Sequence, residues 1–467
     1  MLFHSFEFIL AFLPVVVVGY AILVHLSATT AKLWLILASF VFYGWAEPLA
    51  VPILAGSIVI NFVISLRLDP DKEASGKWLY FALFVNILAL GIFKYSKFAA
   101  SNFNTLFGAR LNAPSLLLPL GISFFTVQQI MFLVDRHQGI APRQKLLDYT
   151  LFVSWFPYIV AGPITRWKDV LPQFQDQKLA VEHDTLARGV TLFILGLSKK
   201  VILSSAFAPW ADTGFAHPAQ LGFAGSWLTA IGYALQLYFD FSGYTDMARG
   251  AGLMFKVSLP ENFNDPFRSR SIIEYWQRWH ISLTNFITNY IYTPILRTGR
   301  RPTFQKAMVA TMVTMVIAGA WHGASWCYVL FGAWHGLGLV INHIWRKYKR
   351  RMPGILAWGT TAAFVLVGFV LFRASTPAEA WTVLHSMFLP AHFGGSTLRE
   401  MLADHQPTRS LSIVAGIGLL FYPRTSSKVA SQAKLRPSLA FALAVCVFVC
   451  FVVMNSKPTP GFIYRQF

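Results

Sequence analysis

The chain has 467 residues, of which 55% are hydrophobic and only 13% are charged, and its mean hydropathy is +0.52. This composition excludes a water-soluble globular protein with an ordinary charged surface and predicts a polytopic membrane protein. The formal net charge is +19, but the basic residues lie in short loops beside apolar segments, as in the cytoplasmic loops of membrane proteins. We therefore expect anionic membrane lipids, and no nucleic acid, as the partners of this charge.

Fourteen apolar segments follow one another along the chain. They lie near residues 6–26, 33–46, 49–66, 78–93, 115–134, 149–164, 186–207, 225–245, 281–296, 307–320, 324–345, 355–372, 409–422 and 438–454. Several are shorter than the stretch of about 20 residues that a helix needs to cross a bilayer. We therefore expect an all-α fold with eleven to thirteen transmembrane helices plus re-entrant or interfacial helices.

A dense cluster of arginine and lysine residues at 346–351 indicates a cytoplasmic loop. From this loop, the segment 355–372 should cross the membrane to the outside, and 409–422 should cross back to the cytoplasm. The final helix then places the C-terminus outside. We therefore predict a membrane core at 1–435, followed at 436–467 by a C-terminal transmembrane helix with an extracytoplasmic tail.

The segment near 115–134 carries four polar side chains within an apolar run. They are Ser123, Thr126, Gln128 and Gln129. Such groups usually join neighbouring helices through hydrogen bonds, and we expect that role here. A place on a substrate path is the alternative.

Charged residues also interrupt apolar stretches further along the chain. Lys199 and Lys200 continue an apolar run, and we expect both side chains to extend to the lipid headgroups. Asp240 and Asp246 lie at the end of an apolar helix, where an unpaired carboxylate is costly. We expect nearby arginines to neutralise them.

The block 274–282 combines an ion-pair spacing with a histidine. Glu274 and Arg278 are four residues apart, which allows them to pair on one helical face. His280 follows beside Trp279, in what we expect to be an interfacial helix. From the residues alone, His280 fits a structural role as well as a functional one.

The stretch 318–326 places an ionisable side chain, His322, between two glycines. The preceding apolar run, 308–320, is about 20 Å long as a helix, which is shorter than a hydrocarbon core of about 30 Å. We therefore expect the helix to end inside the membrane, with breaks at Gly319 and Gly323 that open a lined cavity beside His322. The alternative is a histidine whose ring nitrogens tie two helices together.

The remaining candidate ligands predict no metal chemistry. Cys327, Cys446 and Cys450 lie in apolar segments and show neither a disulfide framework nor metal-ligand spacing. We expect no metal and no tightly bound cofactor. His335 and His343 lie on the helix that follows His322, and we expect structural roles for them.

Several segments together resemble the membrane-bound O-acyltransferase family, in particular its bacterial alginate O-acetylation branch. They are the block up to Pro14, 118–139, 156–166, 238–249, 260–264, 276–282, Trp321-His322-Gly323, Trp334-His335-Gly336 and 462–467. A single Trp-His-Gly motif is a weak signal, whereas this ordered set extends over nearly the whole chain. The resemblance implies a ring of helices around a thinned centre, with a tunnel that joins a cytoplasmic thioester site to an outer funnel.

The resemblance also implies roles for three residues. His322 matches the invariant histidine of the family, and His280 matches its second histidine. The last helix and its tail are similar to the small companion subunit of a teichoic acid D-alanylation system, whose tail tyrosine is the proposed acyl carrier; the corresponding residue here is Tyr464. Family members work with a separate extracytoplasmic transferase of the SGNH esterase type, which we expect as a periplasmic partner.

The resemblance and the residue chemistry agree on acyl transfer. A neutral imidazole can accept the proton of a hydroxyl group while that hydroxyl attacks a thioester carbonyl. We expect a multi-pass protein of the bacterial cytoplasmic (inner) membrane. It should move an acyl group, which we expect to be acetyl, from a cytoplasmic thioester such as acetyl-CoA to an extracytoplasmic polysaccharide. Action on peptidoglycan or teichoic acid, transport of a lipid-linked sugar and a non-catalytic scaffold role are the alternatives.

Overall fold

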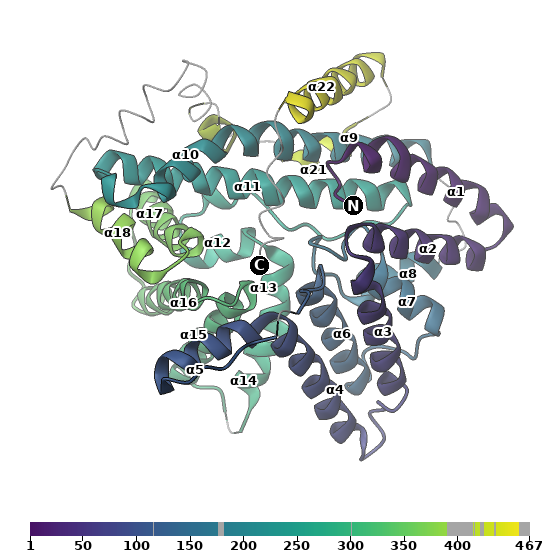
Figure 1. The fold of residues 1–467 in the computed structure, drawn as a ribbon, viewed down its shortest axis with the longest axis horizontal. Coiled ribbons are helices and arrows are strands. Elements are labelled where there is room, and N and C mark those ends of the chain that lie inside the picture. Colours follow the sequence, from purple (N-terminus) through teal and green to yellow (C-terminus); the bar gives the residue numbers. More distant parts are fainter. Residues whose placement is uncertain are drawn as a thin grey trace. The chain divides into compact units, whose positions relative to one another are not determined.

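The structure is a computed structural model, and it describes residues 1–114, 116–175, 182–299, 301–389, 414, 416–420, 425–433 and 436–456. Over these residues the fold is all-α, as predicted (Figure 1). The same residues contain no strand, and the nearest approach to one is an isolated antiparallel bridge between Phe263 and Trp279.

The chain divides into two compact units. The first comprises Met1–Leu197, Tyr244–Pro260 and Ser426–Cys446, in their described parts. The second comprises the described residues of Ser198–Gly243, Glu261–Thr425 and Val447–Phe467. The predicted boundary between 435 and 436 is not tested by this division and stays a prediction.

The helices of the first unit are α1 (Leu13–Leu26), α2 (Ala28–Ala46), α3 (Val51–Ser65), α4 (Ser75–Leu90), α5 (Ser96–Phe107), α6 (Ile122–His137), α7 (Leu146–Ser154), α8 (Trp167–Gln175), nearly all of α9 (His183–Ser198) and α21 (Ser426–Ser431). Those of the second are α10 (Ser205–Ala216), α12 (Ile272–Arg278), α13 (Ile281–Ile287), α14 (Thr293–Arg297), α15 (Phe304–His322), α16 (Trp326–Lys347), α17 (Gly354–Arg373) and α18 (Pro377–Phe388). Besides α9, whose last residue belongs to the second unit, the helices α11 (Phe223–Met254) and α22 (Pro437–Ser456) contribute residues to both units.

Polar side chains join the helices of the first unit. The helices α3, α4 and α6 lie side by side (Figure 1). The Gln129 amide donates to Ser57 Oγ at 2.9 Å and accepts from the Tyr149 hydroxyl at 3.1 Å, while Gln128 donates to Thr165 Oγ1 at 2.8 Å. The predicted helix-joining role of the polar residues on α6 is therefore confirmed for Gln129, whereas Gln128 joins α6 to the non-helical segment before α8.

Eight helical stretches among the described residues are long and apolar enough to cross a membrane. They are Glu7–Leu26, Pro48–Ser65, Ser75–Phe107, His183–Ala216, Phe304–His322, Trp326–Lys347, Gly354–Arg373 and Pro437–Ser456. This finding agrees with a polytopic membrane protein. The count of eleven to thirteen crossings, the orientation, the ring and the tunnel stay predictions.

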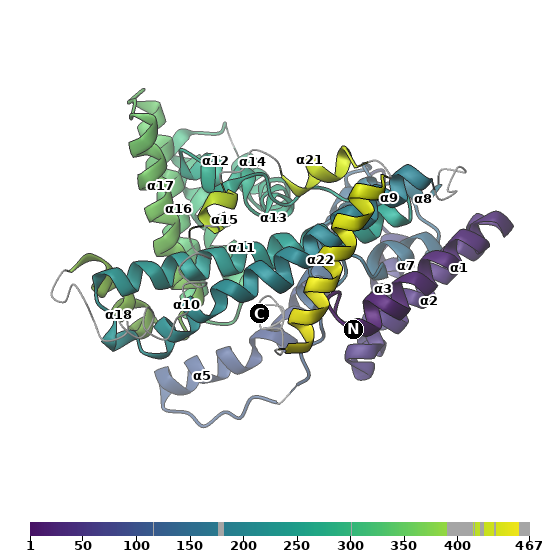
Figure 2. The same ribbon diagram turned by 90° about the horizontal axis from the view of Figure 1, so that it is seen from above.

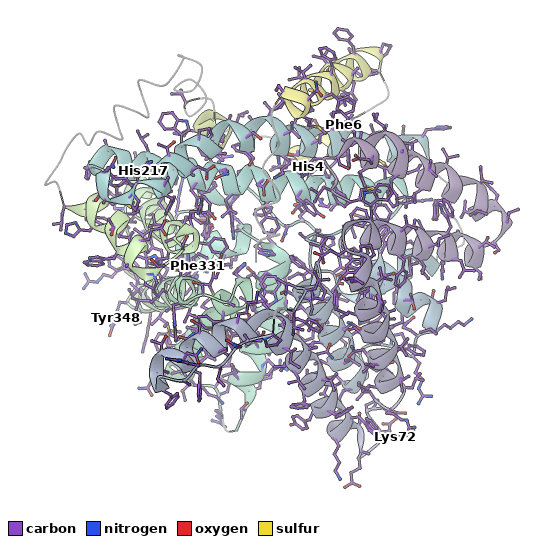
Figure 3. All side chains as sticks on the ribbon, viewed as in Figure 1. His4, Phe6, Lys72, His217, Phe331 and Tyr348 are labelled. Atoms are coloured by element: carbon purple, nitrogen blue, oxygen red, sulfur yellow. The ribbon has the colours of Figure 1, made fainter. Side chains whose placement is uncertain are left out.

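The second unit is organised around α15 and α16, which pack closely against each other. In addition, α12 and α17 pack against α16, and α18 packs against α17. Figure 2 shows α16 and α17 side by side. On α16, Phe331 is buried among the helices, whereas Tyr348, the C-cap residue, projects from the molecule (Figure 3). This arrangement positions the residue at the end of α15, His322.

Candidate active site

The residues that follow His322 end α15 at this point. Gly323 is extended, with φ −172° and ψ 160°, and forms the C-cap of the helix. Ser325 then begins α16, because its side chain accepts a hydrogen bond from the Cys327 N–H at 3.3 Å. The predicted helix end at Gly323 is confirmed, and it leaves His322 at the turn between two helices.

The helix before His322 is longer than predicted. It begins at Phe304, because the Thr303 side chain caps it by accepting a hydrogen bond from the Lys306 N–H at 3.2 Å. Its 19 residues extend over about 28 Å, close to the thickness of a hydrocarbon core. The expectation of a short helix was wrong, since the apolar run 308–320 omits the polar first turn.

Gly319 is not a helix break, contrary to the prediction, but lies inside α15 where α16 approaches it closely. A Cβ atom at Gly319 would lie 2.3 Å from the carbonyl oxygen of Tyr328 and 2.8 Å from the Cα atom of Gly332. Small residues at such contacts allow membrane helices to pack backbone to backbone. The two glycines therefore fix α15 against α16 one turn before His322.

His322 lies in an aromatic environment and is only 3% exposed. Its ring centroid is 5.2 Å from those of Trp321 and Phe372 and 6.1 Å from that of Phe331. These rings come from α15, α17 and α16 respectively. They exclude water from the imidazole and limit the directions from which a reactant can reach it.

His280 occupies the junction between α12 and α13 in a conformation that is unusual for its residue type. Its φ of 46° and ψ of 51° lie in the left-handed region, which costs a non-glycine residue on the order of 1–2 kcal/mol. Backbone hydrogen bonds hold the junction: the Ile281 N–H donates to Asn262 O at 3.0 Å, and the Asn264 N–H donates to Arg278 O at 2.9 Å. Strain of this kind is often retained at functional sites.

Asn262, which is 1% exposed, fixes the orientation and the tautomer of His280. Its Oδ1 atom contacts His280 Nδ1 at 3.1 Å, the Ser282 N–H at 3.1 Å and the Ser282 Oγ at 2.9 Å. A backbone N–H can only donate, so the contacted atom of Asn262 is its oxygen and His280 Nδ1 must donate to it. A neutral His280 ring therefore carries its lone pair on Nε2.

Burial keeps His280 neutral. The residue lies outside the candidate membrane spans and is 0% exposed. Removal from water disfavours the imidazolium and lowers the pKa of His280 from 6.5 to about 3. Its charge therefore does not change between pH 5 and 8, and it acts as a neutral hydrogen-bonding group.

The structure brings together the two histidines that the sequence selected separately. The ring centroids of His280 and His322 are 6.2 Å apart. Trp321 lies beside both rings, 6.4 Å from His280 and 5.2 Å from His322, and Phe241 meets His280 edge-on at 4.8 Å. Two buried imidazoles thus converge from different elements on one small region.

Other predicted residues have structural contacts or lie elsewhere. Glu274 and Arg278 form the predicted ion pair, with 2.9 Å between the charged atoms. His335 Nδ1 accepts a hydrogen bond from Trp276 Nε1 at 3.2 Å, which joins α16 to α12 and agrees with a structural role. Tyr464 lies outside the described residues.

One buried ion pair contradicts the prediction for Lys200. Lys200 does not extend to the headgroups, because its side chain is 2% exposed and pairs with Asp240, which is 0% exposed. The described partner of Asp240 is thus a lysine, and an arginine partner stays a prediction. Lys200 lies in a π-helical turn, Lys199–Ser204, a feature frequent at functional sites. The available signal was a lysine and an aspartate in separate apolar stretches, each costly unless paired.

The fold defines a multi-pass membrane protein with two buried histidines close to each other, and sequence comparisons identify the class. Residues 122–377, more than half of the chain, match the model of MBOAT, the membrane-bound O-acyltransferase family. The chain belongs to this family and is an O-acyltransferase. Both His280 and His322 lie within the matched range, as does Asn262.

Three relatives illustrate the range of the family. A peptidoglycan O-acetyltransferase from Helicobacter pylori is 38% identical over 421 residues, covering 83% of this chain and 80% of the relative. A probable alginate O-acetylase AlgI from Pseudomonas aeruginosa is 38% identical over 413 residues, covering 86% and 77%. A teichoic acid D-alanyltransferase from Bacillus subtilis is 28% identical over 273 residues, covering 55% and 69%.

Asn262→Ala should lower acyl transfer about tenfold or more while the protein remains folded. The variant frees His280 to rotate and leaves the buried Ser282 N–H without its acceptor, and an unmade buried hydrogen bond costs about 1–3 kcal/mol. The measurement is the initial rate of acyl transfer by the purified variant. Asn262→Asp, which keeps an oxygen at this position, should recover most of the rate.

Asn264→Ala is the matched control, because Asn264 belongs to the same loop but is exposed. It should leave the rate unchanged. If Asn262→Ala and Asn264→Ala behave alike, Asn262 does not position His280 for the reaction.

Proposed function

We propose that the protein moves an acetyl group from a cytoplasmic thioester, acetyl-CoA, through the membrane for O-acetylation of an extracytoplasmic polysaccharide. The observation that carries the proposal is the convergence of His280 and His322 in a buried aromatic setting. Acyl transfer from a thioester requires a group that accepts the proton of the attacking hydroxyl, and a buried imidazole supplies it.

We assign the proton transfer to His322 and the orientation of the reactants to His280. The attacking hydroxyl oxygen forms a bond to the thioester carbonyl carbon, the carbon–sulfur bond breaks, and the hydroxyl proton passes to His322. The imidazolium then returns this proton to the departing thiolate, which leaves as a thiol. Neutral His280, with its lone pair on Nε2, accepts a hydrogen bond from a reactant and takes no net proton.

The relatives support the choice of acyl group and acceptor. Two of the relatives above carry names that specify O-acetylation, one of peptidoglycan and one of alginate. Both polymers offer sugar hydroxyls outside the cytoplasm, and we propose a polysaccharide of this kind as the acceptor. Peptidoglycan is the second candidate, because the peptidoglycan relative is as similar to this chain as the alginate relative. Membership of an O-acyltransferase family favours this reaction over transport of a lipid-linked sugar.

We further propose that the protein lies in the bacterial inner membrane and works with a periplasmic transferase of the SGNH type. Eight apolar helices support a membrane location. An acyl group that leaves the membrane must reach a polymer too large to enter a buried histidine site, so a second, soluble enzyme is a reasonable acceptor-side partner.

Reconstitution tests this proposal. Purified protein in lipid vesicles should release free thiol from acetyl-CoA labelled in the acetyl group, and the label should reach the polysaccharide only when the periplasmic transferase is added. Absence of thioester turnover would refute the thioester reaction. Full polymer acetylation without the transferase would refute the division of labour between two proteins.

The same reconstitution tests Tyr464, the proposed acyl carrier in the tail. The acetyl group would pass from the thioester sulfur to the phenolic oxygen of Tyr464, forming an aryl ester that then transfers to the polymer. Tyr464→Phe keeps the ring and removes the hydroxyl. We expect loss of polymer acetylation with normal membrane insertion, whereas full activity would show that another group carries the acetyl.

A further inference from the structure

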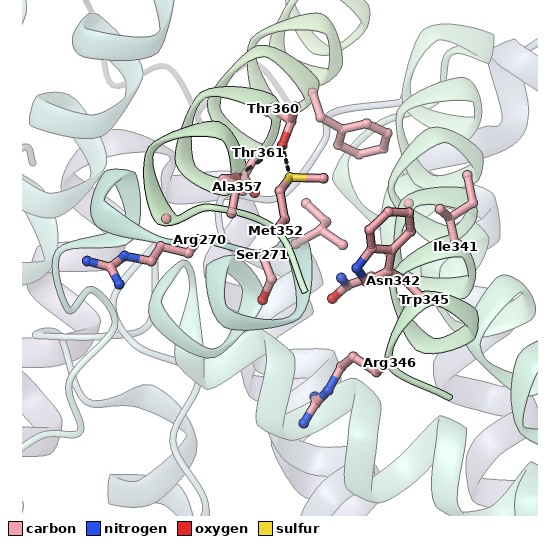
Figure 4. A pocket seen from close by; sticks show the side chains of 14 residues that line it. Arg270, Ser271, Ile341, Asn342, Trp345, Arg346, Met352, Ala357, Thr360 and Thr361 are labelled. Carbon is pink, nitrogen blue, oxygen red and sulfur yellow. Dashed lines mark hydrogen bonds between the residues drawn. The ribbon is translucent and has the colours of Figure 1, made fainter. Parts of the chain in front are cut away.

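A cavity of about 670 Å³ lies within the second unit, between the last part of α16, the first part of α17 and the start of α12 (Figure 4). On α16 it extends from Gly338 to Arg346, a distance of about 12 Å along the helix axis. Neither His280 nor His322 lines it. The cavity is therefore lined by a set of residues separate from the histidine pair.

Much of the cavity wall is apolar. Ile341, Trp345, Met352 and Phe364 contribute to its walls. Three of these side chains remain substantially exposed, Ile341 at 52%, Trp345 at 40% and Met352 at 39%, and the first two belong to a candidate membrane span. Tryptophan near the end of such a span is typical of the level of the lipid headgroups. A hydrocarbon chain that enters between α16 and α17 would cover this surface.

The rim of the cavity is positively charged. Arg270 and Arg346 line it from different elements, with their guanidinium groups at its outer edge (Figure 4). Among the described residues, no carboxylate pairs with either guanidinium. The nearest acidic residue in the sequence, Glu274, already pairs with Arg278 at 2.9 Å and accepts a hydrogen bond from the Arg270 backbone N–H. Within the described part of the chain, the rim therefore presents two cations without a carboxylate counter-ion.

The beginning of α17 adds to the positive potential of the rim. Its first residue, Gly354, lines the cavity, and the N-cap residue Pro353 supplies no side-chain hydrogen bond. The Arg270 guanidinium lies against this end of the helix, since a Cβ atom at Gly354 would be 3.5 Å from Arg270 Nη1. A cation beside the positive end of a helix is unfavourable unless an anion binds between them.

A polar group lies one helical turn deeper than Arg346. The Oδ1 atom of Asn342 is buried and has no hydrogen-bond partner in the described part of the chain. Buried polar groups of this kind are normally satisfied. From the rim inward, the cavity thus presents guanidiniums, then an amide, then apolar walls.

We propose that this cavity binds one anionic phospholipid. The phosphate lies at the rim with Arg270 and Arg346, the glycerol and ester region lies beside Asn342, and an acyl chain follows Trp345 toward Phe364. A soluble phosphate compound would contact the rim and leave the apolar depth uncovered, so the sequence of groups fits a lipid. Arginine is suited to this task because its planar guanidinium binds phosphate oxygens in a bidentate manner.

Native mass spectrometry of the full-length protein tests the proposal. Detergent-solubilised protein incubated with dioleoyl-phosphatidylglycerol should retain one lipid, and dioleoyl-phosphatidylcholine should bind at least about tenfold more weakly. The double variant Arg270→Gln/Arg346→Gln should lose this preference. Ala357→Trp, which fills the cavity and leaves both arginines in place, should also remove the bound lipid.

The double variant Arg350→Gln/Arg351→Gln is the matched control. It removes the same charge from the adjoining loop without changing a lining residue, and it should retain the lipid within about twofold. Equal loss in both double variants would overturn the proposal in favour of diffuse attraction between the basic loop and the membrane. Displacement of the lipid by adenosine 3′,5′-bisphosphate, a soluble probe with the same phosphate chemistry, would overturn it in favour of a site for a soluble anion.

Discussion

Replacement of His322 by alanine should reduce acyl transfer by about 10²–10⁴-fold, the usual contribution of a positioned general base. His322 ends α15 and is 3% exposed, and its ring faces the His280 ring at 6.2 Å. Hydroxyl attack in this water-poor setting has no solvent base to replace the imidazole. The measurement is release of free thiol from acetyl-CoA by the purified variant in lipid vesicles.

Two further variants separate a chemical role from a packing role for His322. His322→Gln retains most of the side-chain volume between Phe331 and Phe372 but is not a base at neutral pH, so it should be as inactive as the alanine variant. His343→Ala removes a partly buried histidine from the neighbouring α16 and should leave the rate unchanged. A His322→Gln protein that turns over near the wild-type rate would show that His322 supports the structure only.

The sequence alone was sufficient for those features that depend on neighbouring residues. Apolar runs predicted the helices, and Gly323 predicted the end of α15, because a glycine at the end of an apolar run is a local signal. The ion pair between Glu274 and Arg278 was also local, since residues four apart share a helical face.

Features that depend on distant residues were not predictable in the same way. Asn262 binds His280 across 18 positions, because the bridge between Phe263 and Trp279 brings the two segments together. The residue type of Gly319 suggested a helix break. In the fold, its lack of a side chain allows Gly332 of α16 to pack closely against it. The sequence gives the position of a glycine or an asparagine, but it does not show which distant residue will contact it in the fold.

The buried pair of Lys200 and Asp240 should determine whether the second unit folds. Replacing one partner, as in Lys200→Met or Asp240→Leu, breaks the ion pair and leaves the other charge buried, and breaking a buried pair costs about 3–5 kcal/mol. Each single variant should therefore show a strongly lowered Tm in detergent and a loss of monodisperse protein in size-exclusion chromatography. The double variant Lys200→Met/Asp240→Leu removes both charges and should recover most of the stability, since apolar replacements of similar volume are often neutral.

The ion pair between Lys256 and Glu182 provides the control, because it is solvent-accessible: the side chains are 28% and 59% exposed, and their charged atoms are 2.7 Å apart. Surface pairs contribute about 0–1 kcal/mol, so Lys256→Met and Glu182→Leu should shift the Tm only slightly, singly or together. Single variants of Lys200 and Asp240 that are tolerated as well as these would show that water or another group compensates the remaining charge. If the double variant recovers stability but not thioester turnover, the pair also has a role in the reaction, and the π-helical turn that carries Lys200 becomes part of the functional site.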